Sequence, residues 1–189
     1  MGSYSTRAIT QEEFSLIIKN IRNGYIDNNG IPHKPNDQVA DILVLEANLG
    51  CRLGDIINLK HEDFICDNGT WKINIVEEKT GKRRTFIVPK AVKELIDDMN
   101  YGNNGRIFSL SKQAVWKHMR LISAYLGLQN TSTHSLRKFC ADRLYENTDH
   151  DIETVCEFLQ HSSISITRAY LRRTDAQLER AISNIVTLA

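Results

Sequence analysis

One stretch of the chain, residues 64–89, carries its apolar side chains at a different spacing from everything on either side. Trp71, Ile73 and Ile75 alternate with polar residues, which is the period of a β-strand with one buried face. The sequence Lys-Thr-Gly-Lys at 79–82 then provides a turn before a further β-prone run. Elsewhere the apolar residues recur every three or four positions, as in amphipathic helices. These spacings predict a mainly α (α+β) fold, with helices around one small three-stranded antiparallel sheet.

The first helix has a clear start and end. Thr10 and Glu13 form a capping box, in which each side chain satisfies a backbone amide of the other residue, and Gly24 marks the end. A loop is expected over 25–35, which contains Asn-Asn-Gly and two prolines. A strongly buried helix over 39–49 follows, closed by Gly50. Further helices are predicted over 53–59, 91–99, 112–126, 135–145, 152–159, 165–171 and 175–186.

The length of 189 residues allows one domain with a proper core. We assign it to 10–189 and treat 1–9 as an N-terminal leader or cloning remnant. No apolar run approaches the roughly 18 residues needed to cross a bilayer, so no membrane segment is predicted. The cysteines form no Cys-x-x-Cys pair, which is typical of free thiols in a reducing compartment and favours the cytoplasm. They are Cys51, Cys66, Cys140 and Cys156.

The net charge is only +1, but the cationic residues are unevenly distributed. One group crowds the predicted hairpin and a second surrounds Tyr170, while many acidic residues lie elsewhere. A local basic surface of this kind is compatible with binding phosphate on one face of the molecule. The first group is Lys79, Lys82, Arg83, Arg84 and Lys90, and the second is Arg168, Arg172 and Arg173.

Several residues could bring chemistry to such a phosphate. His134 and Arg137 lie three residues apart at a predicted helix start, so they share a face near an N-terminus that favours an anion. Tyr170 follows His161 by nine residues, and a phenol attacks well only when neighbouring groups remove its proton. Taken singly, each residue has an ordinary explanation, such as a histidine near a helix cap or a half-buried core aromatic.

Two further features lie nearer the N-terminus. Arg52 comes directly after the buried helix, and Asp55, three residues on, is expected to hold its guanidinium in place. Lys79 stands in the hairpin turn, where a long amine can reach across a groove and donate a proton, and Lys82 is the rival for that role. An ordinary surface ion pair and a solvated turn lysine are the alternatives.

Other chemistries find less support. A metal site would have to be assembled from residues that lack zinc-type spacing, apart from a loose Cys156-x4-His161, so no metal is predicted. The chain has no Gly-rich phosphate loop and no Gly-x-Ser-x-Gly turn, which disfavours nucleotide hydrolysis and serine hydrolase chemistry. The metal candidates considered are His118, His134, His161, Cys140 and Cys156.

In their order along the chain, these residues resemble the catalytic set of the tyrosine recombinases, the phage integrase family. Gly-Cys-Arg-Leu-Gly-Asp is similar to the family's first arginine box, and Glu-Glu-Lys-Thr-Gly-Lys to its lysine-bearing hairpin, which favours Lys79 over Lys82. The closing Leu-Gln-His-Ser-Ser-Ile-Ser-Ile-Thr-Arg-Ala-Tyr matches best. The full set is Arg52, Lys79, His134, Arg137, His161 and Tyr170.

The sequence departs from the family pattern at three positions. Asp55 replaces the commoner glutamate. Lys138 stands where a second histidine often follows the arginine. Gln160 replaces the usual glycine, which would cost about 1 kcal/mol if the backbone there is left-handed.

The resemblance implies DNA strand transesterification. Tyr170 would attack a phosphodiester with help from His134 as base, Arg52 and Arg137 would clamp the non-bridging oxygens, and His161 would add a hydrogen bond. Lys79 would protonate the departing 5′-oxygen. The product would be a 3′-phosphotyrosine that conserves bond energy, so neither ATP nor a metal cofactor is implied.

The resemblance also implies partners. These are double-stranded DNA, a homotetramer assembled on it, and accessory DNA-bending or directionality proteins. Family members usually carry an N-terminal core-binding domain, which this chain lacks, so we expect a piece of a longer phage or mobile-element integrase. Additional DNA contacts are expected from Lys82, Arg83, Arg84, Arg168, Arg172 and Arg173.

Two other functions remain open at this point. A type IB topoisomerase uses a similar set of residues to relax supercoils, although it usually has lysine in place of His134. A non-catalytic DNA-binding module could have kept the basic surface. Covalent capture of DNA by Tyr170 distinguishes the second of these from an enzyme.

Overall fold

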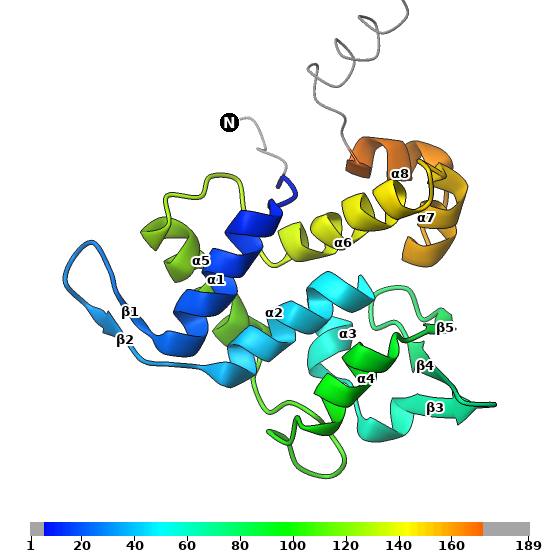
Figure 1. The fold of residues 1–189 in the computed structure, drawn as a ribbon, viewed down its shortest axis with the longest axis horizontal. Coiled ribbons are helices and arrows are strands. Elements are labelled where there is room, and N and C mark those ends of the chain that lie inside the picture. The colour runs from blue at the N-terminus through cyan, green and yellow to red at the C-terminus, as the bar shows by residue number, and fades with distance from the viewer. Residues whose placement is uncertain (1–5, 172–189) are drawn as a thin grey trace, which may run out of the picture.

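A computed structural model describes residues 6–171, and the fold is mainly helical with one three-stranded sheet (Figure 1). This confirms the predicted fold class. The helices are α1 Gln11–Asn23, α2 Asp37–Leu49, α3 Leu53–Ile57, α4 Lys90–Asp97, α5 Lys112–Tyr125, α6 His134–Asn147, α7 Ile152–Leu159 and α8 Ile164–Leu171, with a 3-10 turn at His61–Asp63. The strands are β1 Tyr25–Ile26, β2 Pro32–His33, β3 Phe64–Asp67, β4 Thr70–Val76 and β5 Arg83–Ile87.

The start of α1 is the predicted capping box. Thr10 Oγ1 accepts from the Glu13 amide at 3.2 Å, and Glu13 Oε2 accepts from the Thr10 amide at 2.9 Å. The segment expected as a loop over 25–35 is partly wrong, because β1 and β2 pair within it as a short antiparallel hairpin. The ring of Tyr25 stacks between His33 and Tyr125, which attaches this hairpin to α5.

Helix α2 is the centre of the core. It runs between α1 and α6 on one side and α3, α4 and the three-stranded sheet on the other (Figure 1). Its buried residues leave only a narrow partly exposed stripe. Gly50 ends the helix in the left-handed conformation at φ 56°, so the chain turns sharply into α3.

The sheet has the predicted order and direction, with β4 between β3 and β5 and both pairings antiparallel. Ile73 lies opposite Phe64 on one side and Phe86 on the other. The turn between β4 and β5 is closed by hydrogen bonds from the Glu77 amide to the Lys82 carbonyl and from the Gly81 amide to the Glu77 carbonyl, both 2.9 Å. This turn, residues 77–82, carries both candidate lysines.

The corner between α7 and α8 returns the chain toward α6. Gln160 adopts φ 53° and ψ 40°, so the backbone is left-handed at this non-glycine residue. Its side-chain Nε2 donates to the Arg83 carbonyl at 3.1 Å, which attaches the corner to β5. Helix α8 then packs on α6 and α7.

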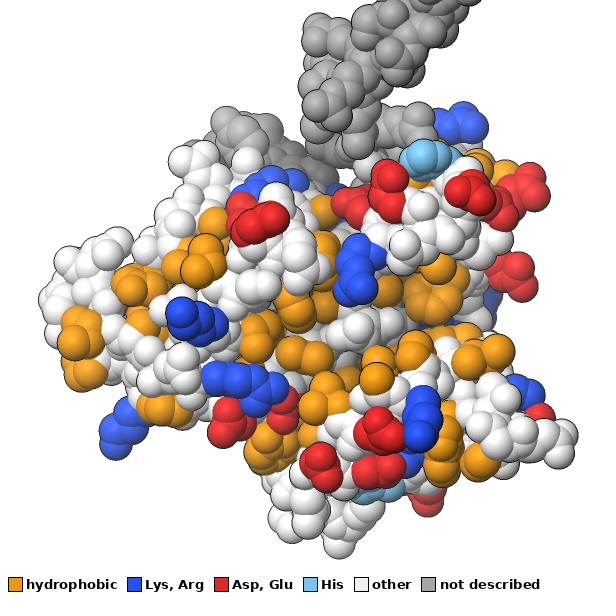
Figure 2. All heavy atoms as spheres, in the orientation of Figure 1, with side chains coloured by type: hydrophobic (Ala, Val, Ile, Leu, Met, Phe, Trp, Pro, Cys, Tyr) orange, Lys and Arg blue, Asp and Glu red, His pale blue; other side chains and the backbone are white. Residues whose placement is uncertain are grey.

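Some predictions fall outside the described residues, namely the helix over 175–186 and the candidates Arg172 and Arg173. None of the helices between residues 6 and 171 is long and apolar enough to cross a membrane. On the face of the molecule shown in Figure 2, cationic and anionic side chains are interspersed, so no patch of a single sign covers that face.

Candidate active site

Arg137 is buried and is held by two backbone carbonyls. It is 1% exposed, and it donates from Nη1 to the Gly50 carbonyl at 2.5 Å and from Nη2 to the Leu159 carbonyl at 2.8 Å. Burial lowers the pKa of its guanidinium, which nevertheless remains a cation because its ordinary value is so high. The two carbonyls end α2 and α7, so Arg137 fastens α6 to both helices.

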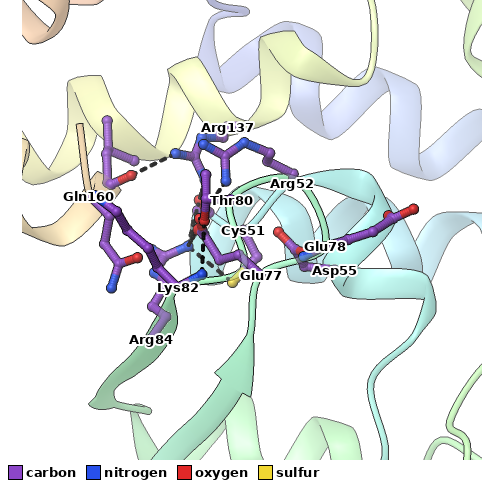
Figure 3. A network of polar contacts seen from close by, with 12 residues as sticks. Cys51, Arg52, Asp55, Glu77, Glu78, Thr80, Lys82, Arg84, Arg137 and Gln160 are labelled. Carbon is purple, nitrogen blue, oxygen red and sulfur yellow. Dashed lines mark hydrogen bonds and ion pairs between the residues drawn. The ribbon is translucent and has the colours of Figure 1, made fainter. Parts of the chain in front are cut away.

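Arg52 reaches the same region from the start of α3. It caps the N-terminus of α3 with extended backbone, and its Nη1 donates to Glu77 Oε2 at 2.6 Å. The guanidinium groups of Arg52 and Arg137 converge above the Glu77 carboxylate (Figure 3). Two guanidinium cations that converge in this way favour the binding of an anion between them.

Asp55 does not hold Arg52, so that prediction is wrong. Its Oδ1 accepts instead from the Glu78 amide at 2.8 Å, and in Figure 3 the Asp55 side chain points toward the hairpin turn. The three-residue spacing brings side chains together only when both residues are helical, and Arg52 lies outside the helix in an extended conformation. Asp55 therefore anchors the turn, not the guanidinium.

The Tyr170 ring contacts both candidate histidines. Its ring meets His134 edge-on with centroids 5.3 Å apart, and meets His161 edge-on at 5.0 Å. The Lys138 ammonium lies 5.1 Å from the centre of the same ring. Desolvation raises the pKa of the Tyr170 phenol, and the nearby Arg137 opposes this. The hydroxyl is therefore protonated near neutral pH. The histidines that its ring contacts belong to the same chain.

Both histidines are neutral imidazoles near pH 7. The pKa of His134 is lowered to about 4 by desolvation and by the cations Arg137 and Lys138. The pKa of His161 is also lowered to about 4, by desolvation, Arg137 and Arg52. A neutral ring can accept a proton at one nitrogen and donate from the other. His161 Nδ1 lies 2.9 Å from Thr167 Oγ1.

The two candidate lysines are both exposed but face different spaces. Lys79 lines a groove of about 1120 Å³ together with Arg52 and His134. Lys82 lines a smaller pocket of about 570 Å³ that contains His161. The residue before Lys79 is fixed, because Glu78 is held at its amide by Asp55 and at its carboxylate by Lys112, 2.5 Å away.

The profile described as the phage integrase family matches residues 7–177, nearly the whole length of the chain. The chain belongs to the phage integrase family. Among curated relatives it is 27% identical to the tyrosine recombinase XerA of Pyrococcus furiosus over 190 residues, covering 93% of this chain and 60% of that protein.

Solved structures show the same fold as this phage integrase domain. The XerH recombinase in its pre-cleavage complex with difH substrate aligns with a TM-score of 0.67 at 22% identity, over 93% of this chain and 53% of that one. The catalytic domain of bacteriophage HP1 integrase aligns with a TM-score of 0.64 at 18% identity, over 95% of both chains. The chain thus spans less than two thirds of XerA and about half of XerH.

One expected DNA contact of this phage integrase domain is wrong. Arg84 is 1% exposed and donates to the carbonyls of Phe158 at 2.8 Å, Gly50 at 3.2 Å and Leu49 at 3.3 Å. It lies opposite Ile75 on the buried face of the sheet. Its guanidinium is bonded to these carbonyls in the interior, so it is not a surface contact of the kind predicted.

The other predicted DNA contacts that the structure describes lie at the surface of the integrase domain. Lys82, Arg83 and Arg168 are exposed, as surface contacts require. Arg83 Nη1 donates to Asn74 Oδ1 at 3.2 Å on the outer face of the sheet.

Sequence reasoning missed Glu77, which is fully buried under the integrase arginines. A signal for it was present, because the alternation of Ile73 and Ile75 places residue 77 on the same buried face. A carboxylate at a buried position requires a cationic or hydrogen-bonding partner.

Proposed function

We propose that this chain cleaves and rejoins DNA strands at specific sites through a 3′-phosphotyrosyl intermediate. The observation that carries the proposal is the seating of Tyr170 against two neutral imidazoles, beside Arg137. The name of XerA as a tyrosine recombinase and the structure of XerH bound to difH substrate support it.

The proposed cleavage is an in-line exchange of one phosphate ester for another. The Tyr170 Oη forms a bond to phosphorus while the bond from phosphorus to the 5′-oxygen breaks. The phenol proton passes to neutral His134, and Lys79 gives a proton to the 5′-oxygen as it leaves. Rejoining reverses these steps with the 5′-hydroxyl of a partner strand.

The arginines stabilise the charge that develops on the phosphate. Arg52 and Arg137 still have N–H groups beyond those bonded to Glu77, Gly50 and Leu159, since each guanidinium has five donors. His161 adds a donor if its Nδ1 accepts the Thr167 hydroxyl proton, which leaves Nε2–H for the phosphate. We assign the proton donation to Lys79 because it shares the groove with Arg52 and His134.

The proposal includes double-stranded DNA as substrate, a homotetramer assembled on that DNA, and accessory DNA-bending or directionality proteins. Because the phosphotyrosine conserves the energy of the broken ester, the cycle consumes no ATP and needs no metal. The four cysteines are free thiols, which suits action in the cytoplasm, where thiols stay reduced.

Covalent capture tests the function and finds the DNA site in the same experiment. The protein is incubated with a library of nicked duplexes of random sequence, in which cleavage releases a short strand and traps the adduct. Denaturation in detergent then removes DNA that is not covalently bound. We expect recovered DNA to converge on one site, and none to be recovered with Tyr170→Phe. Recovery that survives Tyr170→Phe, or no recovery with wild type, contradicts the mechanism.

A further inference from the structure

Glu77 occupies a position between the arginines and the lysine-bearing turn. Its Oε2 accepts from Arg52 Nη1 at 2.6 Å and from Thr80 Oγ1 at 2.9 Å, and its Oε1 lies 3.8 Å from Arg84 Nη1 (Figure 3). The carboxylate is 0% exposed. Arg52, Thr80 and Arg84 therefore account for the position of the Glu77 carboxylate.

The carboxylate is ionised despite its burial. Burial is the largest influence and raises the pKa of Glu77, but hydrogen bonds from Arg52 and Thr80 and the charges of Arg52 and Arg84 together bring it below the ordinary value. The buried group is therefore an anion, and it offsets part of the charge of the guanidinium groups around it.

Glu77 also belongs to the backbone of the turn that contains Lys79. Its amide and carbonyl close that turn through Lys82 and Gly81. One residue thus holds Arg52 with its side chain and the base of the Lys79 turn with its main chain.

The neighbouring arginine fixes Glu77 in turn. Arg84 is held by the carbonyls at the end of α2 and by Phe158, and its guanidinium lies 4.6 Å from the centre of the Phe86 ring and 5.0 Å from that of Phe158. A carboxylate beside such a fixed cation has little freedom to follow the motion of Arg52.

We propose that Glu77 is a positioning residue. Its carboxylate holds the Arg52 guanidinium in the orientation that meets the phosphate and fixes that guanidinium relative to the turn that carries Lys79. This inference rests on the proposed function. It assigns to Glu77 the task that the sequence spacing had suggested for Asp55.

Two modified substrates separate the possible routes of action. A methylphosphonate at the scissile position removes one negative charge, so cleavage depends less on Arg52. A 5′-thio leaving group departs without a proton, so cleavage depends less on Lys79. Single-turnover cleavage is measured on nicked duplexes of the captured site with each modification and with neither.

We expect Glu77→Gln to slow cleavage of the unmodified duplex roughly 10- to 100-fold, the loss of one charge-assisted hydrogen bond. The deficit relative to wild type should shrink on the methylphosphonate and persist on the 5′-thio duplex. Glu94→Gln, the same change at an exposed position of α4, serves as the control and should match wild type. Equal rates for Glu77→Gln and wild type, or recovery on the 5′-thio duplex alone, overturn the proposal.

A double-mutant cycle covers the case in which Glu77→Gln perturbs the fold. Added to Arg52→Ala, Glu77→Gln should cause little further slowing if it acts through Arg52, whereas independent damage would multiply. The conservative Glu77→Asp should recover part of the rate. Multiplying effects in the cycle overturn the proposal. A wild-type protein that forms no adduct defeats the proposed function instead, so the two failures are distinguishable.

Discussion

Arg84 and Arg137 donate hydrogen bonds to one backbone oxygen, that of Gly50, at 3.2 and 2.5 Å. The oxygen is presented to them because Gly50 turns the chain in the left-handed conformation at the end of α2. One arginine comes from the sheet and the other from α6, so this carbonyl joins three parts of the domain.

Gly50→Ala should therefore be more damaging than an ordinary glycine substitution. A Cβ there would lie 2.8 Å from Phe158 Cε1 and 3.1 Å from Cys140 Sγ, in addition to the left-handed strain at φ +56°. We expect a loss of about 2–4 kcal/mol in the free energy of unfolding, measured in urea. Gly127→Ala is the matched control, since it has φ +67° and nothing within 4 Å, and should lose about 1 kcal/mol. Similar losses for the two variants would contradict the packing argument.

Arg84→Met should destabilise the fold and leave the DNA charge contacts intact. The substitution removes the hydrogen-bond donor of the carbonyls that Arg84 contacts and a positive charge near the buried Glu77 carboxylate. We therefore expect the free energy of unfolding, measured in urea, to fall by about 3 kcal/mol or more. Arg83→Met, the exposed neighbour, should change stability by less than about 0.5 kcal/mol.

The salt dependence of DNA binding gives the second readout for Arg84. The slope of log affinity against log salt should be unchanged in Arg84→Met and smaller by about one in a variant that loses a phosphate contact. Lys82→Ala provides that comparison. A reduced slope in a stable Arg84→Met protein would restore Arg84 as a DNA contact.

Cleavage should persist well below the ordinary titration range of histidine. With the pKa values of His134 and His161 at about 4, both rings stay neutral from pH 8 down to about pH 5. Single-turnover rates should therefore show no histidine inflection near pH 6.5 and should fall only toward pH 4. A base that titrates near pH 6.5 would place His134 in a wetter environment than the structure gives it.

The free energy of unfolding should also depend on the protonation of His134 and His161, and it should fall as the pH is lowered. Their pKa is lower in the folded state than in the unfolded chain, so the unfolded state binds more protons between about pH 6.5 and 4. The contribution of the neutral rings is complete above this window and is lost as the pH falls through it. Urea titrations of wild type and His134→Gln across the window measure the difference.

Gln160 offers a paired test of the α7–α8 corner. Gln160→Gly and Gln160→Ala both remove the hydrogen bond to the Arg83 carbonyl, but only glycine relieves the left-handed backbone at φ 53°. The glycine variant should be more stable than the alanine variant by about 1 kcal/mol in urea unfolding. Equal stability of the two would mean that the corner relaxes to another conformation.

Local signals in the sequence predicted much of the fold. The capping box of Thr10 and Glu13, the alternation through Ile73 and Ile75, and the stop at Gly50 each depend on residues close together in the chain. The short β1–β2 hairpin was missed because its pairing depends on Tyr25 stacking against the distant α5.

The errors at the site have one physical origin. Partners of Arg52 and Arg84 are set by strand register and by the approach of the sheet to α2 and α7, which a single sequence does not encode locally. The pairing of Arg52 with Asp55 assumed helical geometry at a residue that is extended. Glu77 could have been suspected from the strand alternation, but its cation could not have been named.

Tyr170 contacts His134 and His161 of its own chain, so the proposed mechanism gives each chain its own complete set of reacting groups. In that mechanism the nucleophile, the base and the phosphate ligands come from one chain, so we expect that chains with different defects do not complement one another. A mixture of Tyr170→Phe and His134→Gln chains should contain no complete site, and its adduct yield should not exceed that of the separate variants. Under the proposed function, exchange between DNA duplexes would then require that DNA strands, and not catalytic side chains, move from one chain to another.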